Sequence, residues 1–155
     1  MIRSGVKMRL VDVMQHALPQ VKVAYTWAGD EATDSTVWLG ESIGQLDPES
    51  MDRTGPLVVD SWSIQCAIEL HGFQEASDAE REVNDALTAV DEVLRSALRL
   101  RRIPGLDDGD TSSWGTVRDV RLGNVDGPFH SNPGLTGGDL IVGFATFELL
   151  CTADL

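Results

Sequence analysis

The stretch from Ser77 to Leu100 constrains the fold of this chain more than any other segment. Its apolar residues recur every three or four positions, which places them on one stripe of an α-helix about 36 Å long. Ser77 and Glu80 predict a capping box at the start, and Pro104 prevents continuation beyond the end. Because only one stripe is apolar, we expect the helix to lie on a flat surface. The stripe consists of Ala79, Val83, Ala86, Leu87, Val90, Leu94, Ala97 and Leu98.

The segments around this helix have the patterns of β-strands. Residues 21–27 and 35–41 predict two short strands that pair antiparallel to each other. Residues 57–70 predict a longer strand, and residues 114–124 predict one of mixed phase. Residues 139–152 are apolar on both faces, so that strand is central or covered by a partner. These are the strands of the flat surface that the helix requires.

The strand over residues 57–70 alternates most clearly. One of its faces is apolar and should meet the long helix, while the other should face water or a neighbouring subunit. The apolar face carries Trp62, Ile64, Cys66, Ile68 and Leu70, and the other carries Ser61, Ser63, Gln65, Ala67 and Glu69.

The rest of the chain predicts one short helix and several irregular segments. Residues 8–18 suit an amphipathic helix that Pro19 ends. Residues 1–7 are expected to form a flexible arm, and residues 42–56 and 123–138 to form long loops. The sequence therefore predicts a single α+β domain over residues 1–155, with a mostly antiparallel sheet of about five strands packed against one long and one short helix.

Length and composition exclude several classes of protein. The 155 residues suffice for one domain with a real core. No apolar run approaches the roughly 18 residues that a membrane span needs, and the N-terminal residues lack the pattern of a signal peptide. We therefore expect a cytoplasmic site of synthesis. Cys66 and Cys151 lie in apolar runs, which favours reduced core thiols over a disulfide.

The charge is strongly negative and unevenly distributed. The formal net charge of −13 argues against a surface that binds duplex DNA, because phosphate binding needs clustered Lys and Arg. Residues 28–60 contain eight acidic side chains and a single base, Arg53, whereas residues 1–24 contain four bases and a single acid, Asp12. A chain with a basic end and an acidic body can stack head to tail or in a ring, although solvated faces produce the same asymmetry.

No catalytic or metal-binding constellation emerges from the residues. His16, His71 and His130 have no metal-ligand spacing to another His or Cys, and the acidic turn around Asp107 is best interpreted as solvated. His130, with Asp126 nearby, is the least improbable functional histidine, and would mark the pocket of a small enzyme or ligand-binding domain. We expect no cofactor and no metal. The absence of a catalytic constellation favours a structural or assembly role over an enzymatic one.

The order and texture of the segments carry a resemblance to a known family. A short helix ending in Ala17-Leu18-Pro19 is followed by the strands Val21-Lys-Val-Ala-Tyr25 and Val37-Trp-Leu-Gly40. After a loop come Trp62-Ser-Ile-Gln-Cys-Ala-Ile-Glu69, an Ala- and Glu-rich helix, a tryptophan-bearing strand and the closing strand Gly143-Phe-Ala-Thr-Phe-Glu-Leu-Leu-Cys-Thr152. Over nearly its whole length the chain resembles the tail terminator (tail completion) proteins of long-tailed bacteriophages.

This resemblance implies a non-enzymatic virion protein at the neck end of the tail, assembled in the host cytoplasm. It implies a hexameric ring that caps the tail tube, stops its polymerisation and offers the surface to which the head–tail joining protein binds. DNA would pass through the ring without specific binding. The alternatives are another head–tail joining or minor tail protein, a tail-assembly chaperone, and, in a different class, the enzyme or ligand-binding domain around His130.

Two groups of charged residues are our candidates for the functional surfaces. No family motif assigns them; they are interpretations of the charge pattern. Acids of the 28–60 region are expected to face the lumen or the tube, and arginines at the end of the long helix are expected to pair with acids of the next protomer. The acids are Asp30, Glu31, Asp34, Glu41, Asp47, Glu49 and Asp52, and the arginines are Arg95, Arg99, Arg101 and Arg102.

Overall fold

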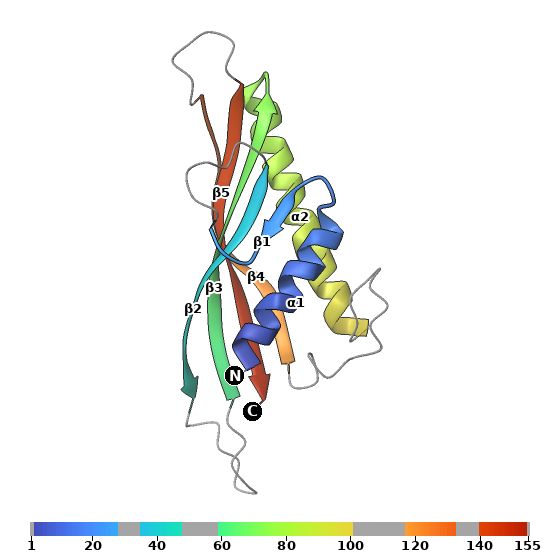
Figure 1. The fold of residues 1–155 in the computed structure, drawn as a ribbon, viewed down its shortest axis with the longest axis vertical. Coiled ribbons are helices and arrows are strands. Elements are labelled where there is room, and N and C mark those ends of the chain that lie inside the picture. The colour runs from blue at the N-terminus through green and yellow to red at the C-terminus, as the bar shows by residue number, and fades with distance from the viewer. Residues whose placement is uncertain (1, 28–34, 48–58, 101–116, 133–139, 155) are drawn as a thin grey trace, which may run out of the picture.

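The fold is an α+β arrangement in which two helices lie on a five-stranded, mostly antiparallel sheet. The computed structural model describes residues 2–27, 35–47, 59–100, 117–132 and 140–154. Both helices cover the same face of the sheet, and their apolar side chains join those of the strands in one core (Figure 1). The elements are α1 (Ile2–Ala17), β1 (Lys22–Ala24), β2 (Thr36–Asp47), β3 (Val59–Phe73), α2 (Ala76–Leu100), β4 (Val117–Ser131) and β5 (Ile141–Asp154).

The strands lie in the order β1-β2-β3-β5-β4. The pairs β2–β3, β3–β5 and β4–β5 are antiparallel, but β1 runs parallel to β2, with Lys22 opposite Thr36 and Ala24 opposite Trp38. The expected antiparallel pairing of the first two strands is therefore wrong. Between Ala24 and Thr36 lie eleven residues, enough to return the chain to the end where β1 began, whereas an antiparallel pair needs only a tight turn.

The long helix and the strand before it follow the sequence prediction closely. The apolar face of β3, from Trp62 to Leu70, is buried, as are Val83, Val90 and Leu94 of α2. The helix begins at Ala76, and the carbonyl of Glu75 accepts a hydrogen bond from the N–H of Ala79. Ser77 thus lies inside the first turn, and the predicted capping position is wrong by about two residues.

The expected flexible arm over residues 1–7 is wrong, because α1 begins at Ile2. The apolar stripe of this helix includes Val6 one turn before Leu10, and both side chains are fully buried. Arg3 forms an ion pair with Asp60 of β3. The sequence did not predict these first turns because Arg3, Gly5 and Lys7 are atypical of a buried helix. In the folded chain Lys7 is nevertheless buried, and its ammonium group lies 4.0 Å from the centre of the Tyr25 ring.

Two predicted loops are partly strand. Residues 42–47 belong to β2, which continues past an irregularity between Leu39 and Ser42. Gly44 permits this, because a Cβ there would lie 2.4 Å from the carbonyl oxygen of Ser61. At the other end of the fold, β4 extends to Ser131 through several register shifts, which explain the mixed phase of its sequence. Residues 48–56 and 133–138 of the expected loops lie outside the described residues.

β5 lies in the interior of the sheet between β3 and β4, as its two apolar faces predict. Ala145, Phe147 and Leu149 point into the core beneath the helices. Gly143 lets α2 approach the strand, since a Cβ at this position would lie 2.6 Å from the carbonyl oxygen of Ala79.

Candidate interaction surfaces

Of the seven acids expected to face a lumen or tube, two lie within the described residues. Glu41 lies on β2 and is exposed to solvent, which is compatible with a surface role. Asp47 ends β2, and its side chain is not among those described. Outside the described residues lie Asp30, Glu31, Asp34, Glu49 and Asp52. Their common surface therefore stays a prediction.

The arginine cluster is likewise represented by one side chain. Arg95 lies on the last turns of α2, with its side chain 79% exposed, and contacts Asp91 one turn earlier at 3.0 Å. Such an exposed pair contributes little to stability and leaves the guanidinium group accessible. Arg99 lies in α2, but its side chain is not described, and Arg101 and Arg102 lie outside the described residues.

The face of the sheet opposite the helices, called here the open face, carries a mixture of polar and aromatic side chains. Ser61 and Gln65 of β3 are exposed there, as the alternation predicts, and Ser63 and Glu69 are partly exposed. No described helix or strand covers this face. On β4 and β5, Phe129 and Phe144 lie opposite each other with their ring centroids 5.5 Å apart.

A concavity of about 410 Å³ lies on the open face near the ends of β2, β3 and β5. The strand register forms it, because Trp38 lies opposite Ala67, and Glu69 opposite Phe144. His71 Nε2 lies 2.8 Å from Glu69 Oε1, although the imidazole ring is not oriented for a hydrogen bond. The site combines two aromatic side chains with one partly exposed carboxylate. Its lining is Trp38, Ala67, Ile68, Glu69, His71, Ser131, Val142, Phe144, Ala145 and Thr146.

His130 lies outside this concavity. It occupies the end of β4, with about half of its side chain exposed, and its Nδ1 lies 3.2 Å from the carboxylate of Glu80 on α2. Asp126 lines a second, shallower concavity of about 270 Å³ that does not include His130. The structure therefore does not bring the two residues of the enzyme alternative into one pocket.

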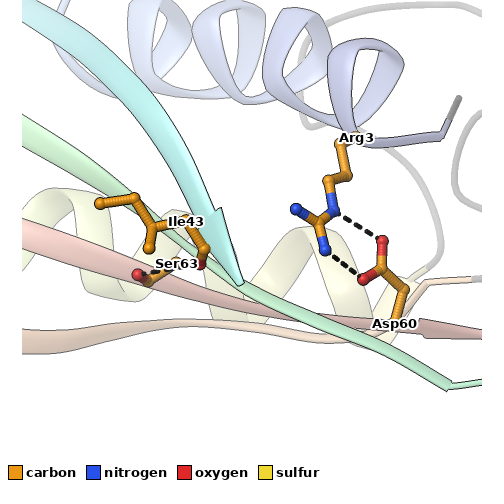
Figure 2. A network of polar contacts seen from close by, with 4 residues as sticks. All are labelled: Arg3, Ile43, Asp60 and Ser63. Carbon is orange, nitrogen blue, oxygen red and sulfur yellow. Dashed lines mark hydrogen bonds and ion pairs between the residues drawn. The ribbon is translucent and has the colours of Figure 1, made fainter. Parts of the chain in front are cut away.

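The most buried charged pair joins α1 to the start of β3. Arg3 Nε lies 2.7 Å from Asp60 Oδ2, and a second guanidinium nitrogen binds Oδ1 (Figure 2). The hydrogen bonding that Arg3 donates to the Asp60 carboxylate is the main cause that raises the pKa of Arg3. The guanidinium carbon also lies 5.4 Å from the centre of the Trp62 ring. Burial lowers the pKa of Lys7, the other charged group of α1 that the core encloses.

Both cysteines are buried free thiols, as predicted. Burial is the main cause that raises the pKa of Cys151 to about 12 and raises that of Cys66 further. A thiol is a nucleophile only as the thiolate, so neither group is poised for catalysis at neutral pH. Both lie on the core side of the sheet, where they pack as small apolar side chains.

Among the described residues, the His, Cys, Asp and Glu side chains form no group of three or more that could hold a metal ion. Within these residues, neither helix has both the length and the apolar character that spanning a bilayer requires.

Comparison with known proteins gives no further identification. The sequence matches no model of a known protein family and no curated protein.

The concavity around Glu69 was not predicted from the sequence. The alternation of β3 does place Glu69 on the open face, but the approach of Trp38 and Phe144 depends on the registers of β2 and β5. These pairings join segments that are far apart in the sequence, so no local pattern identifies these neighbours. The Arg3–Asp60 pair was missed because its two partners are 57 residues apart in the sequence.

Proposed function

We propose that this protein is a tail terminator of a long-tailed bacteriophage. It is a structural virion component that lies at the neck end of the tail and caps the tail tube as a ring. The ring stops tube polymerisation and provides the surface for the head–tail joining protein. By the same resemblance, the ring is a hexamer assembled in the host cytoplasm.

The observation that carries the proposal is the one-sided architecture. Helices cover one face of the sheet, and the open face bears partly exposed aromatic side chains between polar ones. Exposed apolar surface rimmed by polar residues marks sites of protein–protein interaction. A subunit whose sheet is covered on one side only is suited to assembly with further chains. The order of the elements, helix-strand-strand-strand-helix-strand-strand, agrees with the order on which the resemblance rests.

The charge supports passage of DNA rather than its binding. A net charge of −13 gives no electrostatic gain with phosphates. We expect no measurable binding to duplex DNA at about 0.15 M salt, where screening leaves charge effects in place over roughly 8 Å. Tight, salt-dependent binding of DNA would contradict this part of the proposal.

Electron microscopy of phage particles made without this protein tests the function directly. Overlong tails support a terminator. Tails of normal length with unjoined heads indicate a head–tail joining protein instead, and absence of the protein from finished wild-type particles indicates an assembly chaperone.

Light scattering provides the second test. The purified protein is measured alone and with tail tube protein, and we expect a closed oligomer in at least one condition. A stable monomer under both conditions contradicts the ring.

A further inference from the structure

The concavity around Glu69 has the chemistry of a site for a basic side chain. Trp38 and Phe144 supply aromatic surfaces, and cations bind favourably over such rings. The Glu69 side chain is 34% exposed, and its carboxylate has acceptor positions beyond the one near His71. The volume of about 410 Å³ is in the range of pockets that hold small ligands, about 300–1,000 Å³. A guanidinium or ammonium group would satisfy both features of the site.

An exposed arginine lies at the other end of the molecule. Glu69 and His71 lie near the end of β3, a few residues before α2 in the chain, so the concavity is near the N-terminal end of that helix, whereas Arg95 lies 19 positions beyond Ala76. At 1.5 Å per residue this corresponds to about 28 Å along the helix. Arg95 belongs to α2, and this helix lies on the face of the sheet opposite the open face (Figure 1). The two groups therefore cannot meet within one chain.

The other exposed bases fit this role less well. Arg81 lies near the start of α2, at the same end as the concavity, and pairs with Asp78. Arg121 lies 3.7 Å from Asp119 on its own strand. Lys22 lies opposite Thr36, which in turn lies opposite Glu69, so Lys22 is at the same end of the molecule as the concavity. Among the described bases, Arg95 combines high exposure with the position farthest along the helix.

We propose that Arg95 of one copy inserts into the Glu69 concavity of the next copy of this chain. The contact joins two different surfaces, so it is heterologous, and repetition closes a ring if the rotation between copies permits. The helix supports this direction, because its first turns carry Asp78, Glu80 and Glu82 and its last turns carry Arg95 and Arg99. The inference rests on the proposed ring function and specifies the contact between neighbouring copies.

A charge exchange tests the contact. The full chain is prepared as wild type, Glu69→Arg and Arg95→Glu, and each is examined by sedimentation velocity. In each variant alone the two surfaces carry like charge, so we expect self-association to weaken at least about tenfold. In an equimolar mixture every contact can again join opposite charges, because each variant offers the charge that the other lacks. We expect the mixture to recover the assembly, which also shows that both variants fold.

The controls carry the same charge changes at two other exposed positions, both on α2. Arg81→Glu and Glu92→Arg should each sediment like the wild type. Full assembly of Glu69→Arg or Arg95→Glu alone, failure of the mixture to recover, or equal loss in the controls would overturn the contact while an assembling wild type preserves the proposed ring. A wild type that stays monomeric with and without tube protein would overturn the proposed function itself.

Discussion

The guanidinium group of Arg3 binds both carboxylate oxygens of Asp60, and thereby connects the first turn of α1 to the first residues of β3. Asp60 is only 2% exposed, and the guanidinium group of Arg3 lies against its buried carboxylate. The pair shows that the first turn of α1 belongs to the folded domain. It also gives the most direct test of how α1 is held.

Replacing Arg3 with alanine should lower the free energy of unfolding by about 3 kcal/mol, because it leaves a buried carboxylate without its counter-charge. Urea denaturation at neutral pH measures this. The matched control is Arg81→Ala, which breaks the exposed pair with Asp78 and should cost less than about 0.5 kcal/mol. Equal effects of the two substitutions would show that the Arg3–Asp60 pair does not stabilise the fold.

Truncating Val6 tests the N-terminal extension of α1. Val6 is fully buried, so Val6→Ala should destabilise by about 2 kcal/mol through lost burial and the cavity left behind. Met8 is 62% exposed two residues later, and Met8→Ala should change little. Chemical denaturation measures the free energy of unfolding of both variants. An unchanged stability of Val6→Ala would support the flexible arm predicted from the sequence.

Gly143 and Gly5 should respond in opposite ways to alanine. At Gly143 a Cβ would lie 2.6 Å from the backbone of Ala79, and separating α2 from β5 should cost about 1–3 kcal/mol. At Gly5, within α1, a Cβ would meet nothing within 4 Å, and alanine should stabilise by about 0.5–1 kcal/mol. Thermal melts of the two variants measure the difference. A tolerated Gly143→Ala substitution would contradict the close packing of helix and strand.

The buried thiols should make the fold sensitive to alkali. Their pKa values are raised in the folded protein, to about 12 for Cys151, whereas the unfolded thiols ionise near 9.0. The unfolded state therefore loses protons first, and stability should fall as pH rises above about 9. The expected loss is about 1.4 kcal/mol per thiol for each pH unit in this window.

Denaturant unfolding between pH 8 and 10.5 measures this slope. The double variant Cys66→Val, Cys151→Val should show a shallower decline than the wild type, whatever its stability at pH 8. Identical slopes would show that the thiols do not carry the effect.

The sequence predicts the fold where one periodicity dominates. The stripe of α2 and the alternation of β3 each bury one face, so the apolar face of β3 from Trp62 to Leu70 and the apolar stripe of α2 from Ala79 to Leu94 occupy the core as predicted. Prediction fails where local patterns conflict with tertiary contacts. Lys7 looks like a residue of a solvated arm, and only its packing against Tyr25 explains its burial.

The candidate surfaces divide in the same way. Glu41 and Arg95 are exposed, as most charged residues are, and their exposure could be predicted without knowledge of the fold. The concavity around Glu69 required three strand registers, which no single segment encodes. Register is a long-range property, so the neighbours Trp38 and Phe144 became visible only in the folded chain.

The place of β5 between β3 and β4 has a consequence for synthesis on the ribosome. Within the described sheet, β4 is hydrogen-bonded to β5 alone, and β3 has one edge open until β5 arrives. Both strands therefore leave the exit tunnel before the strand that joins them. Until then, the edges of β3 and β4 that β5 will join are unpaired, and the nascent chain must avoid aggregation through them. The five-stranded sheet is complete only after β5, which ends at Asp154, has been made.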